Sequence, residues 1–398
     1  MARRSRPALA HAPHGEEVVW DALVFQGGGA LGAYECGAYE ALAAKGFDFD
    51  LVGGVSVGAA NAAIVASRGS EASTYLGRFW DDLADPMAEV TTSSDPVRRQ
   101  VSAWKSALLG NPAMFVPRWV TAPWTLPSAT EWTSLYSSAP YAHLLRKHID
   151  FPALRESPRR LIVTAVDIQC GEVVLFDSRD TKITVEHILA SGALPPAFPA
   201  VHIGDRAFWD GGIVSNSPAR GVLRALPPED HRRLVLIELF PKRHHIPRNL
   251  EEVLGTMKDL TYMDKLGEDT RKSRADLAMR RVLDECLAAL PPKTRARMQA
   301  LPEFVSVLET HRHDVDLYVL THADEKGELS TKDYDFSPTS LALHRRQGHR
   351  SATAAIADWQ TRPGWAPFGS FRRRPGRVTP RPVAPAQRGA VSARAAAR

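Results

Sequence analysis

The sequence predicts an α/β fold, because short apolar runs alternate with helical segments through the first third of the chain. Residues 22–26 form an apolar run that ends at three glycines, and residues 31–45 then place apolar side chains at helical spacing. A second apolar run covers 50–55, and a small apolar helix is expected over 57–67, ending near Gly69. Strands and helices that alternate in this order are typical of a sheet covered by helices.

The middle of the chain supplies further strand candidates. Residues 160–166 and 172–176 are strand-like and can pair around Gly171, and 234–240 is another apolar run. Between them, 184–194 is helical in pattern until a group of prolines breaks it. These prolines are Pro195, Pro196 and Pro199.

A different pattern begins after Pro241, where apolar residues over 250–257 and 282–290 recur at the spacing of amphipathic helices. One more strand candidate follows at 316–321. The end of the chain is rich in Pro, Gly, Ala and Arg, a composition that favours disorder. We therefore expect a flexible N-terminus over 1–19, an α/β domain over 20–240, a mainly helical extension over 245–360, and a disordered Arg-rich tail over 361–398.

The positive charge of the chain is concentrated in its tail. The formal net charge is +5, but residues 362–398 contain nine Arg and no acidic residue, so the preceding residues carry about −4. The folded body therefore gives no reason to expect a specific nucleic-acid partner. The tail is expected to be solvated, or to attach to anionic lipid or nucleic acid through unspecific electrostatics.

Composition also bounds the cofactors and the compartment. Three cysteines lie far apart without C-x-x-C spacing, which argues against a disulfide framework or a structural zinc site, and we expect no metal and no cofactor. We expect the cysteines to be buried as small apolar residues. Residues 1–17 lack the apolar core of a secretion signal, and no apolar run approaches the roughly 20 residues of a spanning helix. We therefore expect a cytoplasmic protein.

The segment Gly54-Val55-Ser56-Val57-Gly58 indicates a nucleophile. It lies between an expected strand and an expected helix, which is the context that gives the G-x-S-x-G pattern its meaning. The glycines on either side let neighbouring backbone approach Ser56, and the helix directs its first amides at the charge that forms during attack on a carbonyl. The alternative is a glycine-rich turn that only lets a helix pack on a sheet.

The loop 27–32 follows the first strand and opens the first helix, so its backbone amides can converge on an anion. One interpretation is an oxyanion hole for Ser56. The other is a G-x-G-x-x-G dinucleotide site, with Asp48 or Asp50 on the ribose. Both aspartates precede the second strand, whereas a ribose contact needs an acid at the end of that strand, so the first interpretation is favoured. The G-x-G-x-x-G glycines are Gly27, Gly29 and Gly32.

A serine nucleophile needs a group that accepts its proton. Asp210 lies in Phe208-Trp209-Asp210-Gly211-Gly212, at the end of a short apolar stretch, where two glycines keep the adjacent space open. The alternative for Asp210 is an ordinary Asp-Gly turn. A Ser-His-Asp triad would instead need a histidine, and the candidates stand in no distinctive context. They are His244, His311, His313 and His322.

Together these segments resemble the patatin-like phospholipases. The likeness includes the glycine loop, the serine elbow, the Asp210-Gly211-Gly212 motif, the run 190–199 upstream of it, and Asn216 and Pro218 after it. It covers about 20–225, and residues 245–360 look similar to a C-terminal extension of some bacterial members.

The resemblance implies a three-layer α/β/α sandwich with a mostly parallel central sheet. It also implies a lipid acyl hydrolase with a Ser-Asp dyad and no catalytic histidine, in which Ser56 attacks a fatty-acyl ester and Asp210 accepts its proton. A dinucleotide-binding protein and a catalytically silent lipid-binding protein are the alternatives from other classes. Carried over residue by residue, the oxyanion donors are the amides of Gly27, Gly28 and Gly29, and the motif glycines are Gly32, Gly54, Gly58, Gly211 and Gly212.

An aromatic stretch over 104–136 shows neither helical nor strand periodicity. Trp and Tyr suit the boundary between water and an apolar phase, so this stretch can cover an acyl-chain pocket or touch a lipid surface in peripheral membrane contact. The alternative is an irregular loop packed on the core. Its aromatic residues are Trp104, Phe115, Trp119, Trp124, Trp132 and Tyr136.

Overall fold

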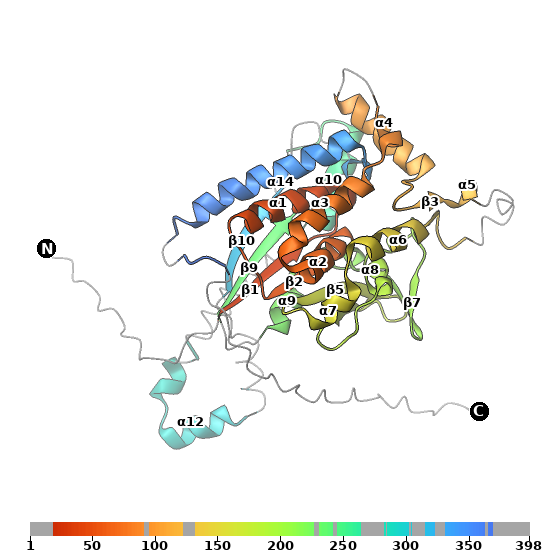
Figure 1. Ribbon diagram of the computed structural model, residues 1–398. Helices are drawn as coiled ribbons and strands as arrows, with labels where there is room; N and C mark the ends of the chain where they lie inside the picture. Colours follow the sequence, from red (N-terminus) through yellow and green to blue (C-terminus); the bar gives the residue numbers. More distant parts are fainter. Residues whose placement is uncertain are drawn as a thin grey trace, which may run out of the picture.

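The computed structural model describes most of the chain (Figure 1). The expected flexible N-terminus lies almost wholly outside the described part, as does most of the Arg-rich tail. The described residues are 19–90, 95–121, 132–226, 231–241, 245–263, 282–283, 285–301, 304, 315–322, 331–362 and 365–368.

An eight-stranded mixed sheet forms the centre of the protein, in the order β10-β9-β1-β2-β5-β8-β7, with β6 on the remaining edge of β5. The ladders that join β10, β9, β1, β2 and β5 are parallel, and those that join β6, β8 and β7 are antiparallel. Every residue of β1 is buried, as expected for a central parallel strand covered on both faces. The strands are β1 Val19–Phe25, β2 Leu51–Val55, β5 Arg160–Asp167, β6 Val173–Asp177, β7 Val201–Ile203, β8 Arg206–Asp210, β9 His231–Glu238 and β10 Val315–Thr321.

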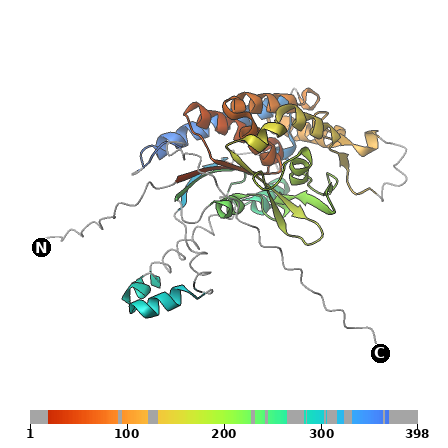
Figure 2. The same ribbon diagram turned by 60° about the horizontal axis from the view of Figure 1, so that its bottom comes forward.

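Helices cover both faces of the sheet, which gives the three-layer α/β/α sandwich that the resemblance implies (Figure 2). Alternate residues of β1 enter different cores: Leu23 and Phe25 face the layer of α1, α2 and α3, whereas Ala22 and Val24 face α9. The sandwich is therefore held by two apolar cores. Its helices are α1 Gly32–Ala44, α2 Val57–Arg68, α3 Ala72–Leu83, α6 Ala139–His148, α7 Phe151–Glu156, α8 Val185–Ser191 and α9 Ala219–Ala225.

The remaining elements are short turns of helix, a small hairpin and the helices of the later chain. No helix in the described ranges is both long and apolar enough to cross a membrane. These elements are η1 Gly29–Leu31, η2 Gly69–Glu71, η3 Pro86–Ala88, η5 Gly211–Ile213, η6 Lys332–Tyr334, β3 Val116–Pro117, β4 Tyr136–Ser137, α4 Asp95–Leu109, α5 Arg118–Thr121, α10 Leu250–Tyr262, α12 Pro292–Gln299 and α14 Pro338–Trp359.

The segment expected as a helical extension contributes to the central sandwich. Strand β10 extends the sheet beside β9, and the long helix α14 (blue in Figure 1) lies along α1. The two helices approach so closely that a methyl group on Gly37 would collide with the carbonyl oxygen of Arg345, and one on Gly348 with that of Tyr34. Arg345 also pairs with Glu40 of α1, with Nη2 and Oε1 2.6 Å apart. Glycine is thus required where these two helices cross.

Several expectations from the sequence can be compared with these elements. The pair 160–166 and 172–176 is the hairpin β5–β6, and 316–321 is β10. The short hairpin β7–β8 was not predicted, because its strands are brief and partly exposed. The expectation that all three cysteines are buried was wrong, since only one of them is buried and the other two are exposed. Cys36 is the buried one, and Cys170 and Cys286 are exposed.

We expect Gly348→Ala to lower the free energy of unfolding by about 2 kcal/mol or more, because the new methyl would overpack the crossing of α1 and α14. At an unconstrained position inside a helix, a Gly→Ala change stabilises the protein by roughly 0.5–1 kcal/mol. A loss of stability in Gly348→Ala would therefore point to the close helix crossing as its cause. Urea unfolding measures the effect. Thr353→Ala, at an exposed position of α14, serves as control and should change stability by less than about 0.5 kcal/mol. A stabilised Gly348→Ala variant would contradict the observed crossing.

Candidate active site

Ser56 lies between the end of β2 and the start of α2, in a strained backbone conformation. Its φ is 56° and its ψ is −128°, and among the described residues it is the only non-glycine residue with positive φ. Such a conformation persists only where the surroundings impose it, and it is the conformation of a serine on a strand-to-helix elbow. The local geometry expected from the sequence is therefore present.

The glycines around the elbow leave room for close backbone contact. A methyl group on Gly54 would collide with the carbonyl of Gly58, and one on Gly58 would collide with the carbonyl of Gln26 at the end of β1. Helix α2 can therefore start directly against the two strands only because these positions carry no side chain.

The register of the sheet brings Asp210 next to the elbow. Strand β6 occupies one edge of β5, so β2 and β8 must share the other edge. On that edge Val55, the last residue of β2, pairs with Thr164. One step further along β5, Asp210, the last residue of β8, pairs with Ala165. Two segments about 150 residues apart in the sequence thus end side by side.

Asp210 lies beside Ser56. Its side chain is 3% exposed, and its Oδ1 accepts the N–H of Gly212 at 2.7 Å. Burial raises the pKa of Asp210 from 3.8 to about 7, although the Gly212 hydrogen bond and the nearby Ser56 hydroxyl act to lower it. A methyl group on Gly211 would lie 2.8 Å from the carbonyl oxygen of Thr164, which explains the first glycine of this motif.

The segment before the prolines supports both residues of this pair. The N–H of Ser56 donates to the carbonyl oxygen of Ser191 at 3.1 Å and to its Oγ at 3.0 Å. The Ser191 hydroxyl in turn donates to the carbonyl of Thr164 at 2.7 Å. Two residues later, the carbonyl of Ala193 accepts the N–H of Asp210 at 3.1 Å. The run 190–199, which only the family resemblance singled out, therefore aligns the serine with the carboxylate.

The glycine loop lies against Ser56. A methyl group on Gly27 would be 2.9 Å from Cβ of Ser56 and 2.5 Å from Oδ1 of Asn216, so this position allows the closest approach. Gly28 and Gly29 are half-buried, and no described residue accepts a hydrogen bond from their N–H groups. Gly29 has a φ of 54°, which favours glycine. Two backbone donors beside the serine thus remain available to an anion.

A buried polar network that the sequence analysis did not predict anchors this loop. Glu35 accepts the N–H of Gln26 at 2.7 Å and the side-chain amide of Asn61 at 2.8 Å, and Asn61 accepts Nε1–H of Trp80 at 3.0 Å. Burial raises the pKa of Glu35 well above its usual range, although its hydrogen bonds with Asn61 and Gln26 act to lower it. The signal in the sequence was limited to one polar residue among small and apolar neighbours in each of two helices, Glu35 in α1 and Asn61 in α2.

Residues from the later chain hold the other side of the loop. The carbonyl of Asp333 in η6 lies where a methyl group on Gly29 would be, and Lys258 of α10 pairs with Asp333 at 2.6 Å. Asn216 donates from Nδ2 to the carbonyl oxygens of Gly27 and Tyr262, each at 2.9 Å. The segment expected as an extension therefore forms part of the candidate site.

These contacts disfavour the dinucleotide interpretation. The carbonyl of Asp333 packs against Gly29, and Gly32 packs against Trp80, so both glycines serve close packing within the fold. Asp48 pairs with Arg159 at 2.7 Å, and Asp50 accepts a backbone N–H of β1 at 2.9 Å. Both aspartates therefore lie before β2, at the opposite end of the sheet from the loop.

Among the described residues, no histidine is hydrogen-bonded to Asp210. His322 follows β10, where its ring packs edge-on against Tyr34 with the centroids 4.9 Å apart, and it lies 5.6 Å from the ring of His344. The other histidines considered for a triad lie outside the described residues. They are His244, His311 and His313.

The aromatic stretch over 104–136 divides into parts. Its first residues, 104–109, form the end of helix α4, so the expectation of an irregular segment was wrong there. The apolar spacing of this helix starts at Val97 and Val101, before the stretch begins, so residues 104–109 alone do not show it. Phe115 and Tyr136 pack against each other and against Phe198, with Phe115 5.6 Å and Tyr136 6.1 Å from its ring. Residues 122–131, which include Trp124, lie outside the described residues.

Fold and site define the class of protein: a three-layer α/β/α protein with a strand-serine-helix elbow beside a buried aspartate. A family model described as patatin-like phospholipase matches residues 23–223, and a second, described as patatin phospholipase, matches 260–364. The chain belongs to the patatin-like phospholipase family. It is a hydrolase, of the lipid acyl hydrolase type.

Solved structures of bacterial effectors are similar to this chain. VipD from Legionella pneumophila is 14% identical with a TM-score of 0.37, over 85% of this chain and 67% of VipD. The type III effector ExoU is 14% identical with a TM-score of 0.32, over 86% of this chain. The chain spans only 54% of that ExoU chain. No curated protein sequence matches the chain.

The raised pKa of Asp210 predicts that this residue costs stability at neutral and higher pH. Between pH 3.8 and about 7 the folded protein retains a proton that the unfolded chain releases, so the free energy of unfolding falls as pH rises. We expect Asp210→Asn to be more stable than the wild type at pH 8, by up to about 4 kcal/mol, and equally stable near pH 4.

Thermal unfolding of both proteins across this pH range measures the difference. Asp205→Asn, at an exposed turn before β8, is the matched control and should show no such dependence. An Asp210→Asn variant whose relative stability is the same at pH 4 and pH 8 would refute the buried, proton-holding carboxyl.

Proposed function

We propose that this lipid acyl hydrolase cleaves carboxylic esters through a dyad of Ser56 and Asp210. The observation that carries the proposal is the position of the strained Ser56 beside the buried Asp210 carboxylate, next to two backbone N–H groups that no described residue accepts. A nucleophile, a proton acceptor and an anion site are the three groups that acyl transfer requires.

In the first half of the reaction, Ser56 Oγ attacks the ester carbonyl carbon while its proton moves to Asp210. The carbonyl oxygen becomes negative and is stabilised by the N–H groups of Gly28 and Gly29, with the close packing at Gly27 bringing the loop near enough. Asp210 then gives the proton to the departing alcohol oxygen. The product of this half is an acyl-enzyme on Ser56.

In the second half, Asp210 takes a proton from water, which attacks the acyl-enzyme, and the acid product leaves when Ser56 regains its proton. An ordinary aspartate is a weak base at neutral pH, whereas a group with a pKa of about 7 can both accept and return a proton there. Burial of Asp210 therefore substitutes for the histidine of a triad. The triad alternative has no support among the described histidines.

We expect Ser56→Ala and Asp210→Asn each to lower kcat for ester hydrolysis by about 10⁴-fold or more, because each removes a group that moves the proton. Hydrolysis of a soluble short-chain ester measures this loss. A fluorophosphonate probe should label the wild type but not Ser56→Ala. Ser70→Ala, which alters an exposed serine just beyond α2, should keep both labelling and activity.

The pH dependence distinguishes Asp210 from a histidine base. With Asp210 as base, kcat/KM should fall about tenfold per pH unit below its pKa of about 7, and Asp210→Asn should abolish activity at every pH. Near-normal turnover by Asp210→Asn, together with loss on replacing a histidine, would establish the triad instead.

We also propose that α4 brings the enzyme to a lipid surface. Four of its large apolar residues are spaced as one stripe, and each of the four is more than 40% exposed. Helix α4 is connected to the segment that packs against the glycine loop. Ser102 Oγ of α4 donates a hydrogen bond to Oδ1 of Asp335, just after η6, at 2.7 Å. An exposed stripe that includes a tryptophan and adjoins the site suits contact with a lipid phase. The stripe is Val97, Val101, Trp104 and Leu108.

We expect the double variant Trp104→Ser with Leu108→Ser to bind neutral phosphatidylcholine vesicles more weakly and to hydrolyse their lipid several-fold more slowly. Turnover of a soluble short-chain ester should stay unchanged. Vesicle sedimentation and acid release measure the two effects. Ile246→Ser, which removes an exposed apolar side chain outside α4, is the control. Equal losses on vesicles and on the soluble ester would contradict a docking role.

A further inference from the structure

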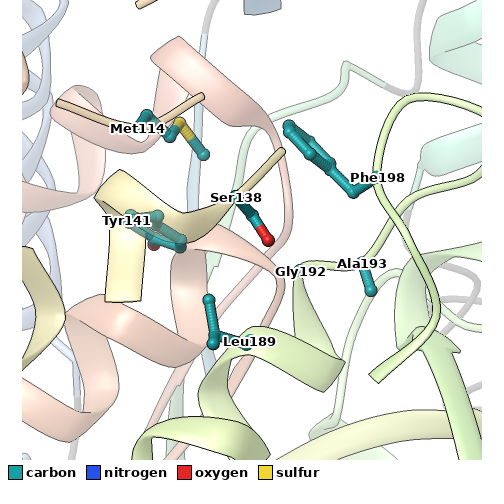
Figure 3. A pocket seen from close by; sticks show the side chains of 7 residues that line it. All are labelled: Met114, Ser138, Tyr141, Leu189, Gly192, Ala193 and Phe198. Carbon is teal, nitrogen blue, oxygen red and sulfur yellow. The ribbon is translucent and has the colours of Figure 1, made fainter. Parts of the chain in front are cut away.

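A small hollow adjoins the candidate site (Figure 3). Two of its lining residues, Gly192 and Ala193, directly follow the serine that accepts the Ser56 N–H, and the carbonyl of Ala193 accepts the N–H of Asp210. The space inside it that a group could occupy is about 10 Å³, which is about the room that one water molecule needs. The hollow therefore suits a single small group, such as one oxygen atom of a substrate. The lining residues are Met114, Ser138, Tyr141, Leu189, Gly192, Ala193 and Phe198.

Most of the lining side chains are apolar, but two carry hydroxyl groups. Figure 3 shows the Ser138 oxygen directed toward the side of the hollow formed by Gly192 and Ala193. The other hydroxyl belongs to Tyr141 of α6, which packs at one wall against Phe79 with ring centroids 6.4 Å apart. A lining made only for a hydrocarbon chain would have no use for these polar groups.

The Tyr141 hydroxyl is buried without a partner. The residue is 4% exposed, and no described residue hydrogen-bonds to its oxygen. Burial raises the pKa of Tyr141 above its ordinary value, and the charge of nearby Asp210 adds to this, so the hydroxyl keeps its proton as a donor. Buried polar groups nearly always have a partner, and an unpaired one is costly. A partner for this donor is therefore expected to arrive with the substrate.

We propose that the hollow is a subsite for one acceptor oxygen carried by the ester, and that the Tyr141 hydroxyl donates a hydrogen bond to this oxygen. The inference rests on the proposed roles of Ser56 and Asp210, because their position decides that the hollow faces the scissile bond. Tyr141 thereby determines specificity: it favours an ester with a hydroxyl or oxo group over the matching plain ester, which leaves the donor unpaired.

The oxygen can belong to the acyl chain or to the alcohol, since either side of the bond offers the same chemistry. Two pairs of soluble esters separate these sources. The acyl pair is propyl pentanoate and propyl 3-hydroxypentanoate, and the alcohol pair is propyl pentanoate and 2-hydroxypropyl pentanoate. Acid release by the full chain gives kcat/KM for each ester.

We expect Tyr141→Phe to lower kcat/KM at least tenfold for the hydroxylated ester of one pair, and to leave propyl pentanoate unchanged or faster. The pair that responds identifies the side of the bond that enters the hollow. Tyr39→Phe, at a buried tyrosine of α1 away from the hollow, is the matched control and should leave every ratio unchanged.

Two results would overturn the subsite. If Tyr141→Phe slows all esters equally, the Tyr141 hydroxyl acts through Asp210 and recognises no substrate oxygen. If Tyr141→Phe changes kcat/KM for none of the esters, the hydroxyl has no role in substrate selection. Fluorophosphonate labelling of Ser56 in the same samples tests the mechanism separately. Retained labelling with unchanged selectivity rejects the subsite alone, whereas an unlabelled wild-type protein rejects the proposed function.

Discussion

The site depends on how closely α2 begins against the ends of β1 and β2. Gly54 faces the backbone of Gly58, and Gly58 faces the backbone at the end of β1, so a single methyl group would separate the helix from the sheet. This contact holds Ser56 at a positive φ. Backbone packing therefore fixes the position of Ser56, and only glycine permits that packing.

Local constraints of this kind were visible in the sequence, whereas the pairing of Ser56 with Asp210 was not. The elbow and the glycine loop each lie within a few residues, so their glycine spacing and the flanking apolar runs predicted them. The approach of Asp210 depends on β2 and β8 sharing one edge of β5, over a separation of about 150 residues. Family resemblance supplied that partner, because no periodicity in the short β7–β8 hairpin could do so.

The charge properties of the site follow from burial and so were equally hidden. In the sequence, Asp-Gly-Gly fits an exposed turn, where an aspartate has an ordinary pKa. In the fold, Asp210 lies under the segment around Ser191 and Ala193, and desolvation raises its pKa to about 7. The same effect raises the pKa of Glu35 beneath the glycine loop. Two carboxyls thus obtain distinct properties from neighbours that are remote in the chain.

The later part of the chain determines whether the loop can hold its shape. Sequence patterns indicated a helical attachment after about 245, yet β10 joins the sheet, α14 packs on α1, and Asp333 and Tyr262 place backbone carbonyls around the loop or its Asn216 support. The two family models match separate stretches, 23–223 and 260–364, but β9, which pairs with β1, lies between them. Asp333 of the second stretch packs against Gly29, whereas Ser56 belongs to the first stretch. We therefore infer that the amides of the loop and Ser56 keep their relative position only when both stretches are folded together.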